Sequence, residues 1–226
     1  CNNWEFTSSI TNAFSQGLGE ATAVRLPHTV KELPLHYPNH QDYQMVCGYR
    51  KKLEISESMR GKRLFLQFDG AAHIATVYLN GQELATHRCG YTAFRVEITD
   101  AVSYGADNQL CVKLDTTENP EVPPFGFVID YLTYGGLYRE VWLDVREASF
   151  VADVFVTTPD LHTAEVSLTT ENAADCVAQI EILDANGMVA ARCEGAPNGV
   201  TTLNVPAAKS WSMEKPRLYT CRVTLR

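Results

Sequence analysis

Apolar and polar residues alternate through most of this chain, and this period of two constrains its fold more than any other feature. Leu64, Leu66 and Phe68 fall on one face of an extended segment, and Val77 and Leu79 fall on one face of another. Successive side chains of a β-strand point to opposite faces, so this alternation predicts strands that bury one face. The same alternation is found at residues 49–55, 94–98, 110–114 and 141–145.

Turn signals separate the predicted strands. Asn80-Gly81 lies between two of them, and both residue types accept the positive φ that a type I′ hairpin needs. Asn186-Gly187 repeats this signal later in the chain. Helical patterns do not exceed about two turns, and residues 56–61 and 100–105 are predicted as single turns. Many short strands joined by Gly and Pro turns predict an all-β chain built of sandwiches.

The pattern restarts near Ala148, which predicts two domains. From Phe150 onward, about seven short strands are expected, a number typical of an immunoglobulin-like sandwich. This part lacks the Cys…Trp…Cys spacing of antibody domains, so a true antibody-type domain is not expected. The predicted domains are residues 1–148 and residues 149–226.

The composition argues against several classes of protein. The chain has 226 residues, 45% of them hydrophobic, which is enough for packed cores. Its formal net charge of −8 argues against nucleic-acid binding, which requires a basic surface. The apolar runs are shorter than the roughly 18 residues of a membrane span, and the start lacks a signal-peptide pattern. We expect neither a nucleic-acid nor a membrane partner.

The cysteine pattern favours a reducing compartment. The chain has seven cysteines and no Cys-x-x-Cys pair. Cys47, Cys111, Cys193 and Cys221 lie inside strand-like runs, where a free cysteine acts as a small hydrophobic residue. We therefore expect reduced thiols and a cytoplasmic protein. Cys1 leaves an alternative open, because a cysteine at this position is also typical of a bacterial lipoprotein or another exported protein.

Five motifs resemble the amino-terminal part of glycoside hydrolase family 2, which includes β-galactosidases and β-glucuronidases. They are residues 68–98, Tyr134-Gly135-Gly136-Leu137-Tyr138-Arg139, Trp4-Glu5-Phe6, Val24-Arg25-Leu26-Pro27-His28, and Trp211 followed by Pro216-Arg217-Leu218-Tyr219. The resemblance implies a jelly-roll, galactose-binding-like β-sandwich followed by an immunoglobulin-like β-sandwich. Gly48 stands where the family has a tryptophan, so we expect an aromatic contact to be lost there.

The resemblance does not extend to catalytic residues. Glycoside hydrolysis requires two carboxyl groups on either side of the bond. The family's acid/base glutamate lies in an Asn-Glu dipeptide on a barrel strand, and this chain has no Asn-Glu. A barrel takes about 250 residues, whereas strand signals occupy all of this chain. The resemblance thus implies the non-catalytic front portion of a glycosidase whose barrel is missing. We predict no catalytic residue and no activity for the chain alone.

The segment from residue 115 to residue 138 is the predicted substrate-binding element. In the galactosidases of the family, an aspartate in this loop contacts the terminal sugar and, in some members, a sodium ion. Asp130 stands at the matching offset, so the resemblance implies this role for it in the full-length enzyme. Sugar rings stack on aromatic faces, so Phe125, Phe127 and Tyr131 are further candidates for a subsite. Packing beneath the loop is the alternative role for these rings.

Other residues of the motifs are predicted to have structural roles. They are Tyr134, Gly135, Gly136, Tyr138 and Arg139 near the loop, and Asn80 and Gly81 in the hairpin. The two adjacent glycines give the backbone the freedom that a tight turn requires. Arg139 is expected to tie the loop to the sandwich through its planar guanidinium.

The histidines do not predict a metal site. His36 and His40 are four residues apart, a spacing that brings ligands together only on a helix, and Pro38 argues against a helix there. We therefore predict neither a metal site nor a resident cofactor beyond the implied sodium. His73 and His87 are expected to face solvent or to be satisfied by neighbouring groups.

Three functions remain open at this stage. The sequence favours the front portion of a β-galactosidase, because Asp130 fits that group best. The alternatives are the corresponding portion of a β-glucuronidase and a stand-alone carbohydrate-binding module. The expected partners are a β-galactoside or related carbohydrate, the protein's own barrel and, as a further alternative, other copies of the same chain.

Overall fold

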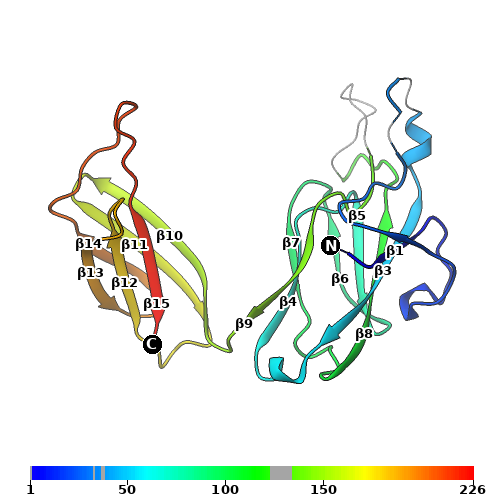
Figure 1. Ribbon diagram of the computed structural model, residues 1–226, viewed down its shortest axis with the longest axis horizontal. Helices are drawn as coiled ribbons and strands as arrows, with labels where there is room; N and C mark the ends of the chain where they lie inside the picture. Colours follow the sequence, from blue (N-terminus) through cyan, green and yellow to red (C-terminus); the bar gives the residue numbers. More distant parts are fainter. Residues whose placement is uncertain (1, 33, 37–38, 123–133) are drawn as a thin grey trace. The chain divides into compact units, whose positions relative to one another are not determined.

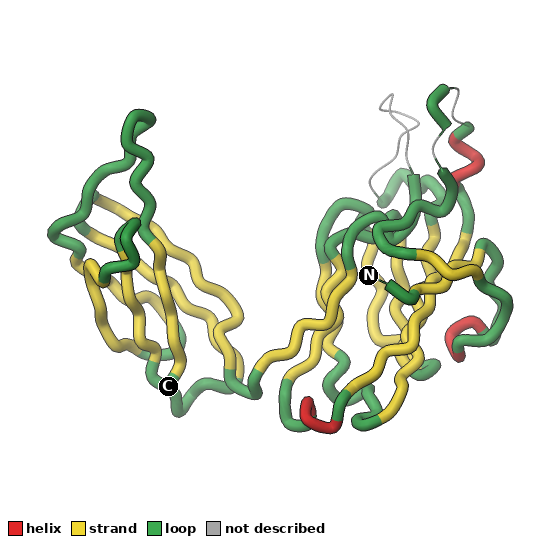
Figure 2. Tube along the Cα trace, viewed as in Figure 1, coloured by secondary structure: helices red, strands yellow, loops and turns green. Residues whose placement is uncertain are grey.

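The computed structural model describes residues 2–32, 34–36, 39–122 and 134–226 of the protein. It separates into two compact units, Cys1–Val145 and Arg146–Arg226. Strands are the main regular secondary structure of both units, and the described helical structure consists of short 3-10 turns in the first unit (Figures 1 and 2). The all-β fold class predicted from the alternation is therefore confirmed.

The first unit is a sandwich of two sheets. One sheet has the strand order β2-β1-β3-β8-β5-β6 and the other has the order β7-β4-β9. Its elements are β1 (Trp4–Thr7), η1 (Phe14–Gln16), β2 (Thr22–Val24), η2 (His40–Tyr43), β3 (Val46–Ile55), η3 (Glu57–Met59), β4 (Arg63–Phe68), β5 (Ile74–Leu79), β6 (Gln82–Arg88), β7 (Phe94–Glu97), β8 (Ala106–Asp115) and β9 (Val141–Arg146).

The core of the first unit follows from the alternation in the sequence. Strand β5 buries Ala75, Val77 and Leu79, while the residues between them remain partly exposed. Strand β3 lies antiparallel to β8, and Tyr49 is paired with Val112. Burial of one face of each strand removes apolar surface from water, which is the main force that holds two sheets together.

The Asn80-Gly81 hairpin joins β5 to β6, as its sequence signal predicts. The φ angles are 53° for Asn80 and 84° for Gly81. The Asn80 side chain also fixes the turn to the neighbouring strand, because its Oδ1 accepts from the Gln109 N–H at 2.9 Å. Its Nδ2 donates to Asn108 Oδ1 at 2.8 Å. The hairpin is thus held both by its own backbone and by β8.

An aromatic ring from another part of the chain occupies the space beside Gly48. A Cβ at Gly48 would lie 2.3 Å from Cε2 of Phe14, so the Phe14 ring fills the space above this glycine. The Cys111 thiol, on the adjacent strand, donates to the Phe14 carbonyl oxygen at 3.2 Å. The ring comes from a residue distant in sequence, which is why the local motif did not reveal it.

The second unit is a smaller sandwich of two three-stranded sheets, with the orders β10-β11-β14 and β13-β12-β15. Its strands are β10 (Phe150–Asp160), β11 (Thr163–Glu171), β12 (Ala178–Leu183), β13 (Val189–Gly195), β14 (Gly199–Asn204) and β15 (Thr220–Leu225). Val166, Leu168, Ile180 and Leu203 lie at the centre of its core.

The turn between β12 and β13 differs from the predicted two-residue hairpin. Gly187 has a φ of 78°, but Asn186 is not among the described residues with positive φ. The Asp184 carboxylate accepts from the N–H groups of both Asn186 and Met188 at 2.9 Å. This side chain organises a longer turn, closed by the Asp184 N–H donating to the Met188 carbonyl at 2.9 Å.

Six cysteines lie within the described part of the chain, and all of them are unpaired. Cys47 and Cys111 are fully buried on strands, as their alternation with polar neighbours predicts. Burial raises the pKa of the Cys47 thiol to about 12, so it is protonated and unreactive at neutral pH. Among the described residues, none of the helices has the length and apolar character needed to cross a bilayer.

Candidate functional site

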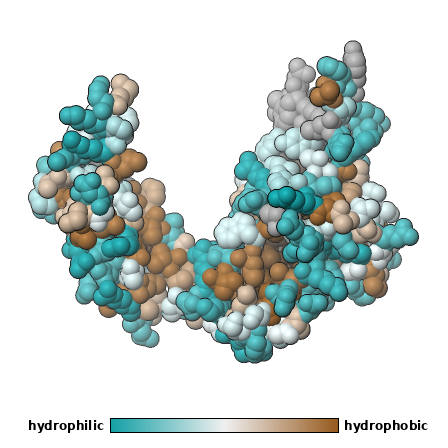
Figure 3. All heavy atoms as spheres, viewed as in Figure 1, coloured by the Kyte–Doolittle hydropathy of each residue, from teal (hydrophilic) through white to brown (hydrophobic). Residues whose placement is uncertain are grey.

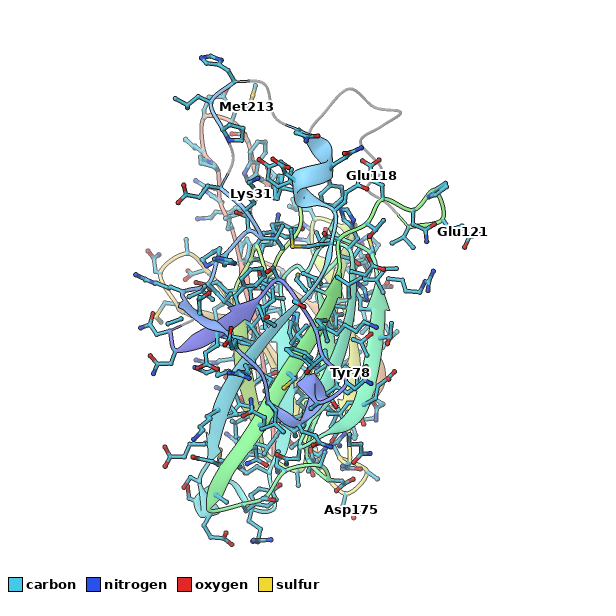
Figure 4. All side chains as sticks on the ribbon, turned by 90° about the vertical axis from the view of Figure 1, so that its right-hand side faces the viewer. Lys31, Tyr78, Glu118, Glu121, Asp175 and Met213 are labelled. Carbon is cyan, nitrogen blue, oxygen red and sulfur yellow. The ribbon has the colours of Figure 1, made fainter. Side chains whose placement is uncertain are left out.

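The predicted substrate-binding element is described at its two ends. Asp130, Tyr131, Phe125 and Phe127 lie outside the described residues. Residues 115–122 and residues 134–139 are described, and they are called the loop stems below. Figure 4 shows Glu118 and Glu121 of the first stem at the same end of the first unit as Lys31.

The first stem is anchored by Thr116. This residue is 1% exposed. Its Oγ1 accepts from the Met45 N–H at 2.9 Å and donates to the Tyr43 carbonyl at 2.5 Å. Its own N–H donates to the Met45 carbonyl at 2.9 Å. A buried hydroxyl that is satisfied in this way fixes the backbone where β8 ends and the loop begins.

The second stem requires both of its glycines. A Cβ at Gly135 would lie 2.2 Å from Cγ2 of Thr116, so the two stems are in direct contact. A Cβ at Gly136 would lie 2.3 Å from the carbonyl oxygen of His28, and Gly136 has a φ of 140°. Only glycine combines this φ with such a close approach to another backbone.

Backbone hydrogen bonds hold the second stem on both sides. On one side, the His28 N–H donates to the Leu137 carbonyl at 2.9 Å and the Val30 N–H donates to the Gly135 carbonyl at 2.9 Å. On the other side, the Ala72 N–H donates to the Gly136 carbonyl at 3.0 Å, and the Gly136 N–H donates to the Ala72 carbonyl at 3.2 Å. The stem therefore forms a short bridge between two separate parts of the first unit.

Tyr138 closes the second stem with its side chain. Its hydroxyl donates to the Gly90 carbonyl at 2.5 Å, and its ring contacts Tyr134 edge to face at 5.8 Å. Gly70 lies beneath the ring, because a Cβ there would come within 2.9 Å of Tyr138 Cζ. Arg139 is exposed, and its guanidinium lies over the Tyr138 ring at 5.8 Å. Its predicted tie to the sandwich remains a prediction.

A polar pair, half-buried His28 and buried Tyr49, supports the stem from below. Nδ1 of His28 lies 2.8 Å from the Tyr49 hydroxyl oxygen, and Phe6 packs against both rings at 5.0 and 5.1 Å. Burial lowers the pKa of His28 and raises the pKa of Tyr49. Both side chains are therefore uncharged at neutral pH, and the pair provides a neutral hydrogen bond beneath the second stem.

His73 lies between the stems and is a residue that the sequence reasoning misjudged. It was expected to face solvent or to be satisfied, but it is 2% exposed, and neither ring nitrogen has a hydrogen-bond partner among the described residues. Its backbone N–H donates to the Asp115 carbonyl at 3.1 Å. Burial lowers its pKa, and the nearby Thr117 backbone offsets part of this shift without completing a hydrogen bond. No local sequence pattern indicates this burial.

The described site can position groups, but what it offers for chemistry is limited to hydrogen bonding and packing. The stems are held by backbone bonds, by a buried hydroxyl and by two glycines that touch neighbouring atoms. Within the described ranges, no cluster of three or more His, Cys, Asp or Glu side chains could hold a metal ion. The arrangement is typical of a rigid base for a binding loop.

Comparison with known proteins identifies the origin of this architecture. A family model described as the galactose-binding domain-like part of glycosyl hydrolase 2 matches residues 4–122. A second model, described as glycosyl hydrolases family 2, matches residues 149–226. A β-galactosidase of Thermoanaerobacter pseudethanolicus is 32% identical over 214 residues, which cover 89% of this chain and 29% of that protein. A β-glucuronidase of Bacteroides fragilis is 35% identical over 176 residues, which cover 77% of this chain and 24% of that protein.

Solved structures agree with these matches. A β-glucuronidase of Lactobacillus rhamnosus superposes with a TM-score of 0.80 at 26% identity, over 98% of this chain and 40% of that one. A family 2 glycosyl hydrolase of Bacteroides cellulosilyticus superposes with a TM-score of 0.77 at 25% identity, over 100% of this chain and 33% of that one. The chain thus spans less than half the length of each relative. The chain belongs to glycoside hydrolase family 2, of which its two units are the galactose-binding-like and immunoglobulin-like β-sandwiches.

Proposed function

We propose that this chain is the non-catalytic amino-terminal portion of a longer glycosidase. Its first unit helps to form the substrate pocket, and its second unit supports the catalytic barrel. The observation that carries this proposal is the rigid pair of loop stems in a chain of family 2. Loops that bind ligands work best when a fixed scaffold holds their ends, because less freedom is then lost on binding.

The proposed division of labour follows from the chemistry of the reaction. Retaining hydrolysis uses two carboxyl groups about 5 Å apart, one as acid/base and the other as nucleophile. In this proposal the barrel supplies both groups, and the first unit orients the terminal sugar. Asp130 would accept hydrogen bonds from two sugar hydroxyls, and it would be the residue that holds a sodium ion. Phe125, Phe127 and Tyr131 would stack against sugar rings.

We infer that the substrate is a β-galactoside, with a β-glucuronide as the alternative. Asp115, Glu118 and Glu121 give the first stem an acidic character. Lys31, at the same end of the unit, is already paired with Asp42 at 2.7 Å. The carboxylate of a glucuronide would meet repulsion from these acids, whereas a neutral galactoside would not. Relatives carry both names, which is why the glucuronide remains the alternative.

The test of this function is a comparison of substrates and of two variants in the full-length protein. We expect catalytic efficiency to be higher for an aryl β-galactoside than for the matching β-glucuronide. Asp130→Asn keeps the shape of the side chain and removes its charge. It should lower kcat/KM at least tenfold, about 1.4 kcal/mol in the activation barrier, with little change in thermal stability. Glu121→Gln, a loss of charge in the first stem, should leave kcat/KM for the neutral β-galactoside unchanged.

Two results would overturn the proposal, one with the full-length protein and one with the isolated chain. Full-length protein that hydrolyses neither glycoside would favour a stand-alone carbohydrate-binding module. The isolated 226-residue chain should not hydrolyse either glycoside, and it should bind galactose only with a Kd in the range of about 1 mM or weaker. Micromolar binding by the isolated chain would favour the module.

A further inference from the structure

The second unit has an apolar groove along the open side of its sandwich. The groove has a volume of about 500 Å³. It lies where β10 and β15, the edge strands of the two sheets, approach each other. Val156 of β10 and Cys221 of β15 form two of its walls, and the segment 208–219 forms another. Buried core residues, including Ile182 and Val205, form part of its floor.

The walls of this groove expose large apolar side chains. Trp211 is 57% exposed, Leu218 is 71% exposed and Leu161 is 50% exposed. Brown, apolar residues gather on the visible face of this unit in Figure 3. Isolated exposed apolar residues are ordinary, but a contiguous set around a concavity marks a surface that binds something.

The charges at the rim indicate what kind of surface would fit. Lys209 and Arg217 line the groove, and neither forms an ion pair within the part of the chain that the structure describes. The one carboxylate of the lining, Asp160, is already used by the His162 N–H at 2.7 Å and the Thr163 hydroxyl at 2.9 Å. A complementary surface would carry apolar side chains with carboxylates beside them.

These charges also argue against a second copy of the chain. In a two-fold contact the same patch lies on both sides of the interface. A groove rimmed by Lys209 and Arg217 would then meet a second groove with the same basic rim, and like charges in a contact are unfavourable. The occupant is therefore expected to be a different surface.

The relatives extend well beyond the region that this chain covers, and that additional part can provide such a surface. This chain covers only 29% of a related β-galactosidase and 33% of a related solved structure. Strand β15 leads away from the groove, and its length from Thr220 to Leu225 corresponds to about 20 Å. A body of about 300 residues has a radius of gyration near 19 Å, so it is wide enough to reach back across this distance.

We propose that this groove is the docking surface for the catalytic part of the longer protein. The occupant inserts apolar side chains between Trp211 and Leu218, and its carboxylates meet Lys209 and Arg217. This inference rests on the proposed function in one respect, namely that a longer protein exists. It predicts that the exposed residues of the groove are covered when that protein is complete.

The test is hydrogen exchange of the backbone amides of residues 208–219, compared between the full-length protein and the 226-residue chain. We expect exchange to be at least tenfold slower in the full-length protein. Leu218→Glu in the full-length protein should remove most of this protection. Val200→Glu is the matched control, because Val200 is 67% exposed in the same unit but lies outside the groove; it should leave the protection intact.

Two outcomes would overturn the docking surface. Equal exchange in both proteins would mean that nothing covers the groove. Protection in the 226-residue chain that disappears on dilution, with a matching change in sedimentation, would mean that a second copy covers it. Activity is not measured in this experiment, so the two proposals can fail separately. An inactive full-length protein with a protected groove would contradict the glycosidase alone, and an active one with an unprotected groove would contradict the docking alone.

Discussion

The two units use the same kind of sandwich but cover it differently. In the first unit, the Phe14 ring covers Gly48 on the outer face of strand β3, and the Cys111 thiol on the adjacent strand is buried too. In the second unit, strand β10 is exposed from Val154 to Asp160. Phe155, in the middle of that strand, is 63% exposed. The first unit therefore contains its own covering segments, whereas the second presents surface that another body can cover.

The largest expected effect compares a crowded glycine with an open one. Gly136→Ala would place a Cβ against the His28 backbone in the first unit, and this backbone cannot move aside easily. We expect the free energy of unfolding to fall by about 3 kcal/mol. Gly187 in the second unit has a φ of 78°, and a Cβ there would have no atom within 4 Å. Gly187→Ala should therefore lower the free energy of unfolding by only about 1 kcal/mol.

Urea denaturation, with hydrogen exchange resolved to each unit, measures both costs. Equal losses for the two glycine variants would show that backbone angle alone determines the cost. In that case the contact between the second stem and the His28 backbone would contribute nothing to stability.

The next effect concerns the buried hydroxyl of the first stem. Thr116→Val keeps the shape of the side chain and leaves the Met45 N–H without the acceptor it has at 2.9 Å. We expect a loss of about 2 kcal/mol, typical of a buried donor left unsatisfied. Thr202→Val, on strand β14 of the second unit, is a control at an exposed threonine and should change stability by less than about 0.5 kcal/mol. Thermal unfolding of the two variants measures both changes in stability. A Thr116→Val protein as stable as the unsubstituted one would contradict the proposed anchoring role of the Thr116 hydroxyl.

A smaller effect separates the units by pH. Burial lowers the pKa of His28, His73 and His87, all in the first unit, from an ordinary value of 6.5. Below that pH the unfolded chain binds more protons at these positions than the folded unit does. The stability of the first unit should therefore fall as the pH drops below about 6.5.

The second unit should respond at lower pH. Hydrogen bonds from Arg222, which has the larger effect, and from Arg192 lower the pKa of Glu181 from its ordinary value of 4.5. A carboxylate with a lowered pKa contributes stability above its ordinary pKa, and this contribution is lost as the pH falls below that value. Thermal melts of each unit between pH 7.5 and pH 3 measure both transitions. If both units lost stability in the same pH range, the predicted difference between them would be wrong.

The smallest expected effect is the removal of the charge at Glu181. Its partners Arg192 and Arg222 have side chains that are 57% and 55% exposed. Water can solvate these guanidinium groups once the carboxylate is gone, so Glu181→Gln should lower the free energy of unfolding less than Thr116→Val does. A loss as large as that of Thr116→Val, measured by urea denaturation, would mean that Glu181, Arg192 and Arg222 act as a buried network.

The sequence predicted those features that depend on local patterns. Alternation identified the strands because burial of one face imposes a period of two, and Asn80-Gly81 identified a hairpin because few residues accept its φ angles. Contacts between distant residues left no such pattern. Phe14 above Gly48 is one example, and the burial of His73 between the stems is another. The turn at Asp184 was mispredicted because a side chain, rather than the Asn-Gly pair, organises it.

The candidate site was predicted less completely than the fold. Its substrate contacts depend on resemblance, and Asp130 with its aromatic neighbours remains a prediction. What the sequence did indicate was the Gly135-Gly136 pair, because two adjacent glycines favour a close backbone approach. It did not reveal Thr116 as their contact, since a single threonine at the end of a strand has no distinctive pattern.

The contact between Thr116 and Gly135 has a consequence for how such a protein can change over evolution. Because the scaffold joins the two ends, the chain between them is a closed loop whose length is not dictated by the sandwich. Doubling the length of a flexible loop costs only about 0.6 kcal/mol in closure entropy. Insertions and deletions there would leave the fold intact and, under the proposed function, would alter what the loop presents to a sugar. A single scaffold could in this way serve relatives named for galactosides and for glucuronides alike.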